Sequence, residues 1–70
     1  MQQKFNVVIE RDSEGGLVAS VPSLHGCHTQ ARSFDELDMR IKEAISLCLE
    51  DEEAITRSEF VGVQQVAVEV

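Results

Sequence analysis

The sequence predicts a small α+β domain with three antiparallel strands, one helix packed across the sheet, and a fourth strand after the helix. Three observations lead to this β-β-β-α-β order. Apolar and polar residues alternate through much of the first 31 residues, a helical apolar period follows, and valines alternate again at the end of the chain. With 70 residues, the chain is expected to form a single domain over 1–70.

The first two strands are predicted to form a hairpin. Apolar residues alternate over 5–10, and again over 17–21, where Leu17, Ala19 and Val21 share one face. Residues 12–16 between them contain Asp, Ser and two glycines, which favour a turn. Pro22 has no N–H to donate and is expected to end the second strand.

A short third strand is predicted over 27–31. Gly26 precedes it and permits a sharp turn. Cys27, Thr29 and Ala31 alternate with polar residues and are therefore expected to lie on one face.

A helix is predicted to begin after Ser33. Ser33 and Glu36 match the capping box, in which the serine accepts the third helical N–H and the glutamate reaches back. The expected apolar stripe consists of Phe34, Leu37, Ile41, Ala44, Ile45 and Cys48. Met39 and Leu47 lie off this stripe, exposed or in contact with a partner.

The helix is also predicted to carry two ion pairs and to end in an acidic run. The pairs are Glu36–Arg40 and Asp38–Lys42, both at the i,i+4 spacing. The acids at 50–53 oppose the negative end of the helix dipole. The fourth strand is then expected over 64–70, with Val66, Val68 and Val70 on one face, returning to the sheet edge by a right-handed crossover.

Charge excludes several classes of function. The chain has 6 basic and 13 acidic residues and a formal net charge of −7, so it lacks the basic surface that nucleic acid or anionic lipid requires.

No signal peptide or membrane-length apolar run is found, and two cysteines are too few for a disulfide scaffold. A cytoplasmic, reduced protein is expected.

Residues 33–59 hold nine acids and three bases, a net charge of −6. This concentration fits either a solvated helix face or a surface complementary to a basic partner.

Four patterns in the sequence suggest chemistry but have simpler explanations, so no catalytic, metal-binding or cofactor-binding residue is predicted. His25, Cys27, His28 and Cys48 lack usual zinc-ligand spacing, and a Cys–His nucleophilic pair has no evident third group. The acids at 10 and 12, or at 35 and 36, suit Mg²⁺ or acid–base chemistry but are also explained by the turn and the cap. The glycines at 15–16 precede a strand, whereas phosphate loops precede a helix.

From residue 7 to residue 50 the chain resembles the HicB family of antitoxins. The resemblance rests on residues 16–19 (Gly-Leu-Val-Ala), 21–30 (Val-Pro-Ser-Leu-His-Gly-Cys-His-Thr-Gln), 33–37 (Ser-Phe-Asp-Glu-Leu) and 41–45 (Ile-Lys-Glu-Ala-Ile). Ala31 and Leu37 depart from the family pattern, which has Gly and Ala there. The motif positions expected to be structural are Gly16, Pro22, Gly26, Cys27, Thr29, Gln30, Ser33 and Glu36.

The resemblance implies a partial RNase H-like fold whose fourth strand lies beside and parallel to the first. It also implies a role as the antitoxin of a type II toxin–antitoxin pair, which binds and occludes HicA, a small basic ribonuclease that cleaves mRNA. Longer members add a C-terminal DNA-binding domain that this chain is expected to lack, so direct nucleic-acid binding is not expected. The expected toxin-binding residues are Asp38, Glu43, Glu50, Asp51, Glu52 and Glu53.

Two other functions remain as alternatives to a non-enzymatic antitoxin. One is an orphan oligomeric binding module or scaffold without a toxin, and the other is a metal-dependent hydrolase. A small core and exposed sheet edges also predict a homodimer or higher homo-oligomer.

Overall fold

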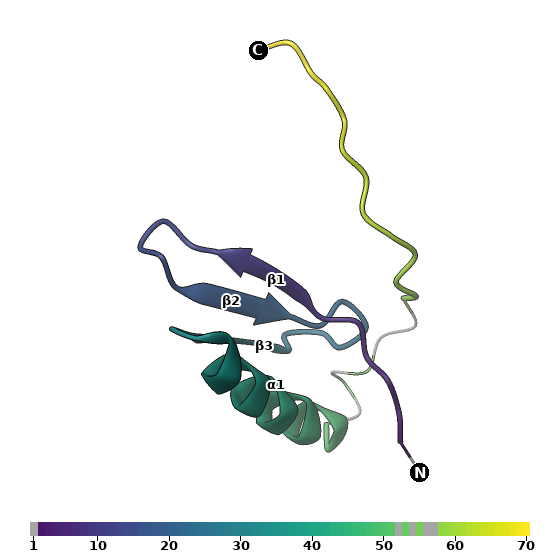
Figure 1. The fold of residues 1–70 in the computed structure, drawn as a ribbon. Helices are drawn as coiled ribbons and strands as arrows, with labels where there is room; N and C mark the ends of the chain where they lie inside the picture. The colour runs from purple at the N-terminus through teal and green to yellow at the C-terminus, as the bar shows by residue number, and fades with distance from the viewer. Residues whose placement is uncertain (1, 52, 54, 56–57) are drawn as a thin grey trace.

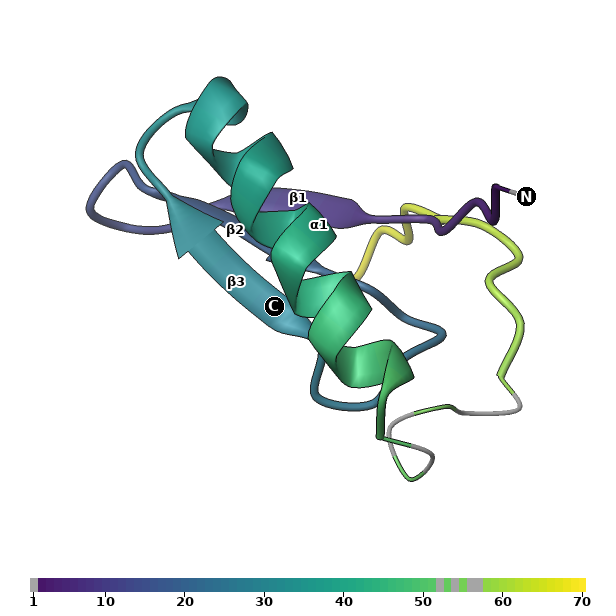
Figure 2. The same cartoon turned by 90° about the horizontal axis from the view of Figure 1, so that it is seen from below.

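The structure, a computed structural model, describes residues 2–51, 53, 55 and 58–70. Strands β1 (Val8–Arg11), β2 (Leu17–Ser20) and β3 (His28–Ala31) precede one helix, α1 (Phe34–Leu49). The strands form an antiparallel sheet in the order β1-β2-β3, and α1 crosses one face of it (Figures 1 and 2). The predicted meander and helix are confirmed, although β1 begins three residues later than predicted and β3 one residue later.

The β1–β2 turn is held by a carboxylate. Asp12 Oδ1 accepts the backbone N–H of Glu14 at 2.9 Å and that of Gly16 at 2.8 Å. Gly15 has φ of +90°, a conformation that glycine adopts at little cost. A Cβ at Gly16 would lie 2.8 Å from Asp12 Oδ2, so the carboxylate can fold over this position only because the side chain is absent.

The β2–β3 connection is a compact loop closed by backbone hydrogen bonds. Val21 N–H donates to the Cys27 carbonyl at 3.0 Å, and Cys27 N–H donates to the Leu24 carbonyl at 3.2 Å. Gly26 turns the chain with φ of +73°, as its place in the sequence predicted. The loop buries Leu24 and Cys27, so it forms part of the core.

Helix α1 begins and ends where the sequence predicted. The Glu36 N–H donates to Ser33 Oγ at 3.2 Å, which is the N-cap, and the helix ends at Leu49 before the acidic run. Both predicted ion pairs form, Arg40 Nη2 with Glu36 Oε1 at 2.6 Å and Lys42 Nζ with Asp38 Oδ2 at 2.9 Å. The Glu36 carboxylate thus binds the next turn of the helix.

The core lies between α1 and two of the three strands. Helix α1 contacts β3 and β2. The buried side chains are Leu17, Ala19, Val21, Leu24, Cys27, Ala31, Leu37 and Ile41. Phe34, predicted to belong to the buried stripe, is 61% exposed, because α1 packs on β3 and β2 and Phe34 lies on the side toward β1, which the helix does not cover. Among the described residues, no helix is long and apolar enough to cross a membrane.

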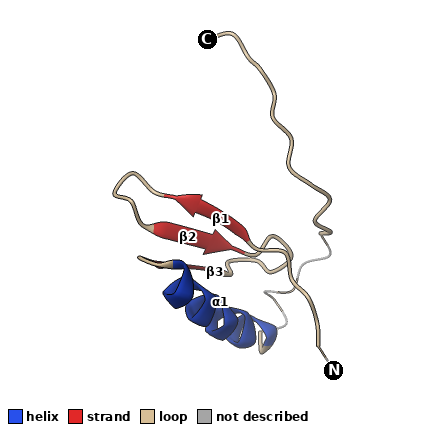
Figure 3. Cartoon of the chain, viewed as in Figure 1, coloured by secondary structure: helices blue, strands red, loops and turns tan. Residues whose placement is uncertain are grey.

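The strand expected over 64–70 is not formed in this structure. Residues 61–70, hereafter the C-terminal tail, are all described, yet none belongs to a helix or strand and all are exposed. The tail runs away from the sheet as extended chain (Figures 1 and 3). Alternating valines favour strand formation, but a strand also requires a neighbour that accepts and donates its backbone hydrogen bonds.

We expect Ser33→Ala to lower the free energy of unfolding by about 1 kcal/mol, because the Glu36 N–H loses its capping acceptor. Chemical denaturation followed by circular dichroism, at one fixed protein concentration, measures the change. Ser46→Ala, in an exposed position within the same helix, is the control and is expected to cause no loss. Equal destabilisation by the two substitutions would contradict the capping role.

Candidate functional site

An open apolar groove of about 360 Å³ lies between β1 and α1. It is lined by six apolar residues and one acid: Val7, Ile9, Ala19, Phe34, Leu37, Ile41 and Asp38. Two of the apolar side chains remain largely accessible to solvent, Ile9 at 47% and Phe34 at 61%. We call this surface the β1–α1 groove.

The position of the helix produces this groove. Because α1 packs on β3 and β2, the helix-side face of β1 lacks a full cover. Ile9 pairs with Ala19 across the sheet, but Ala19 is completely buried while Ile9 is not. In addition, β1 ends the strand order, so within the described chain its outer edge has no neighbouring strand.

A second surface follows the solvent side of α1. Met39, Glu43 and Leu47 lie four residues apart and therefore form one line along the helix, with both apolar members more than 60% exposed. Glu50 and Asp51 continue this line at the end of the helix, and both are exposed. We call these five residues the acidic helix face.

The six residues predicted to bind a toxin do not all lie together. Glu43, Glu50 and Asp51 belong to the acidic helix face, and Glu53 follows it as an exposed residue. Asp38 instead lines the β1–α1 groove and pairs with Lys42. At about 100° per residue, it lies about 140° around the helix from Glu43. Glu52 lies outside the described residues.

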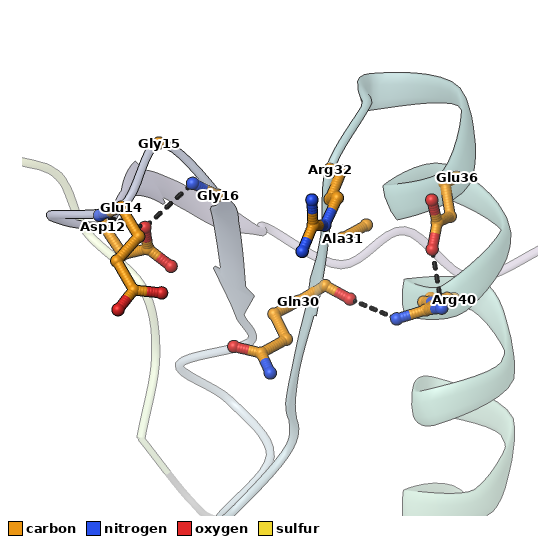
Figure 4. A pocket seen from close by; sticks show the side chains of 9 residues that line it. All are labelled: Asp12, Glu14, Gly15, Gly16, Gln30, Ala31, Arg32, Glu36 and Arg40. Carbon is orange, nitrogen blue, oxygen red and sulfur yellow. Dashed lines mark hydrogen bonds and ion pairs between the residues drawn. The ribbon is translucent and has the colours of Figure 1, made fainter.

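A polar hollow of about 400 Å³ separates the β1–β2 turn from the start of α1 (Figure 4). Arg40 spans its helix side, donating through Nη1 to the Gln30 carbonyl at 2.8 Å while Nη2 pairs with Glu36. On the other side, Asp12 is held by the turn. The residues around the hollow are Asp12, Glu14, Gly15, Gly16, Gln30, Ala31, Arg32, Glu36 and Arg40.

The hollow gives several motif residues a structural explanation. Gly16, Gln30 and Glu36 are distant in sequence, yet they lie around one hollow where they close a turn and join β3 to α1. The remaining motif residues lie in the connections and strand pairs. Gly26 and Cys27 form the buried loop, Ser33 caps the helix, Pro22 follows β2 as an exposed residue, and Thr29 pairs with Ala19.

The two cysteines come together although they are far apart in the sequence. Burial, and to a smaller extent a hydrogen bond and the charge interaction with Cys48, together raise the pKa of the Cys27 thiol from 9.0 to about 11. His25 and His28 are exposed. Throughout the described part of the chain, no three His, Cys, Asp or Glu side chains gather in a group that would hold a metal ion.

Sequence patterns missed the exposure of one side chain and one contact, both of which depend on the packing of the elements. Periodicity assigned Phe34 to the core because it cannot show which strands the helix covers. The Arg40–Gln30 contact joins a side chain to a backbone carbonyl ten residues away. The only sequence signal for it was the i,i+4 pair that also positions Arg40.

Comparison with known proteins identifies close relatives in archaea and bacteria. The chain is 57% identical to a UPF0150 protein of Archaeoglobus fulgidus over 65 residues, which cover 93% of this chain and 94% of the relative. A UPF0150 protein of Synechocystis sp. is 46% identical, covering 96% and 97% of the two chains. A UPF0150 protein of Thermotoga maritima is 36% identical, covering 93% and 89%. No protein-family model matches the chain.

We expect a thiol-alkylating reagent at pH 8 to modify Cys48 first, with Cys27 reacting only when the domain opens, because Cys27 is buried and its pKa is about 11. Peptide mass spectrometry over time measures the two rates.

The raised pKa of Cys27 makes the stability of the fold depend on pH. The folded state favours the protonated thiol, so the stability that Cys27 contributes is present below pH 9 and is lost as the pH rises toward about 11. Equal alkylation rates at the two cysteines in native buffer would contradict the buried position of Cys27.

Proposed function

We propose that this chain, which belongs to the UPF0150 family, is a HicB-like antitoxin that binds and occludes a basic, HicA-like mRNA-cleaving ribonuclease. It acts in the cytoplasm as a stoichiometric protein inhibitor and performs no catalysis itself. The motif residues between 16 and 45 support the family resemblance, and the distribution of exposed charge supports the mode of binding.

The observation that carries this proposal is the acidic helix face. Met39 and Leu47 provide exposed apolar area, while Glu43 lies between them and Glu50 and Asp51 add negative charge at the end of the helix. Exposed apolar side chains beside charged ones can form a protein-binding surface. A ribonuclease must present positive charge to hold RNA, and the same charge attracts this acidic surface during encounter.

The carboxylates near the polar hollow support a role without catalysis. Asp12 Oδ1 accepts two backbone N–H groups, and Glu36 is paired with Arg40. Both acids are therefore used to hold the fold, which disfavours the metal-dependent hydrolase considered from the sequence.

The partial RNase H-like fold belongs to the same proposal. In that arrangement a fourth strand lies beside and parallel to β1. Two features support it: among the described residues the outer edge of β1 has no neighbouring strand, and the adjoining β1–α1 groove is open.

A second candidate function is an oligomeric binding module that has no toxin. The exposed apolar groove and tail favour it, because both surfaces suit association between copies. Homo-oligomer formation is compatible with either function.

To test the antitoxin function, a HicA-like ribonuclease is titrated with the purified chain while cleavage of a labelled mRNA is measured. Cleavage is expected to stop at a fixed molar ratio. The double variant Glu43→Lys/Glu50→Lys removes two negative charges from the acidic helix face and adds two positive ones. It is expected to weaken inhibition at least tenfold at low ionic strength, with a smaller difference at high salt.

The charge-matched control is Glu14→Lys/Glu59→Lys, which changes two exposed acids outside this face. Inhibition by the control is expected to stay within about twofold of the unmodified chain. Equal weakening by the two double variants would remove the acidic helix face from the proposal. Failure to bind or inhibit any HicA-like ribonuclease would remove the antitoxin function itself.

A further inference from the structure

The C-terminal tail has the alternating valines of a β-strand but belongs to no sheet in this structure. Its five valines are each at least 72% exposed, which is unusual for a run of apolar side chains in a folded domain. Val66, Val68 and Val70 occur at every second residue, so an extended backbone places them on one face, spanning about 13 Å. Residues 61–68 carry no charge in a chain whose net charge is −7.

The β1–α1 groove is an apolar surface that lacks a covering strand among the described residues. Its lining is apolar except for Asp38, and the neighbouring edge of β1 offers backbone N–H and C=O groups to a further strand. Val7 and Ile9 lie at the same two-residue spacing as the valines of the tail. An added strand would pair with β1 while its valines cover Ile9 and Phe34.

We propose that the C-terminal tail of one copy lies beside β1 of a second copy, where it forms the fourth strand and covers the β1–α1 groove. Both halves of the contact are exposed on every chain, and the tail of each chain leads away from its own sheet (Figure 1). A two-fold dimer therefore forms the same contact twice and covers both tails and both grooves. The uncharged part of the tail brings no additional negative charge to the partner.

The proposal explains how so small a domain gains apolar burial. Among its described residues, a single chain buries eight apolar side chains, and none of these belongs to the tail. Exchange of the tails adds burial to a domain whose length gives it a limited core. This inference rests on the groove, the β1 edge and the tail, and it is independent of toxin binding.

The first experiment measures the molar mass of the full chain by light scattering across a concentration series. The unmodified protein is expected to form a dimer of twice the 7.8 kDa chain mass. Val66→Asp/Val68→Asp places charge on the face that enters the groove and is expected to raise the dimer dissociation constant at least about a hundredfold. Because the tail lies outside the core, circular dichroism should still show the folded domain.

The matched control is Gln65→Asp/Ala67→Asp, which adds the same charge to the opposite face of the tail. This variant is expected to stay dimeric, with a dissociation constant within about tenfold of the unmodified chain. If both double variants weaken the dimer equally, or if neither does, the proposed orientation of the tail is wrong.

A mixing experiment distinguishes exchange from a tail that folds back onto its own chain. Ile9→Asp damages the groove but keeps the tail, whereas Val66→Asp/Val68→Asp damages the tail but keeps the groove. Each variant alone is expected to be monomeric. An equimolar mixture should form a heterodimer, detected by native mass spectrometry, because one intact tail meets one intact groove.

The proposal is overturned if the unmodified chain is monomeric throughout the concentration series, including a monomer whose tail amides are protected from hydrogen exchange. It is also overturned if the mixture of variants gives no heterodimer. Either result leaves the ribonuclease-inhibition experiment unaffected, so failure of tail exchange and failure of the antitoxin function can be told apart.

Discussion

The packing of Leu37 and Ile41 against β2 and β3 is the contact on which the rest of the structure depends. These two side chains are the only ones of α1 that are buried among the described residues, and they fix the helix over one side of the sheet. The same placement leaves the helix-side face of β1 open and exposes Phe34. One helix cannot cover three strands of a twisted sheet equally, so the uncovered strand becomes the surface available for association.

Because one side of α1 is buried against the sheet, the residues on its opposite side face solvent. The buried stripe turns Met39, Glu43 and Leu47 toward solvent, followed by the acids at the end of the helix. It places Asp38 on the groove side instead. The chain thus has two different surfaces, an acidic one proposed for a basic ribonuclease and an apolar one proposed for the tail of a second copy. Their separation allows both contacts on one molecule.

The motif that suggested an antitoxin family is largely a folding motif. Gly16 makes room for the Asp12 carboxylate, Ser33 caps the helix, and Glu36 holds Arg40 against the end of β3. Local rules predicted the turn, the cap and the ion pairs because each involves residues within four positions. The Arg40–Gln30 contact and the meeting of the two cysteines span longer distances, which local patterns do not encode.

The sequence by itself determined the order of the three strands and the helix and the two ends of α1, since alternation, capping and charge act within one or two turns of chain. It also determined the extended character of the valine-rich tail. Only the tertiary structure decided whether that tail is a strand, because strand formation depends on a neighbour as well as on propensity. It likewise decided which apolar residues are buried. Phe34 fits the helical stripe, but in the described part of the chain it lines an open groove and stays 61% exposed.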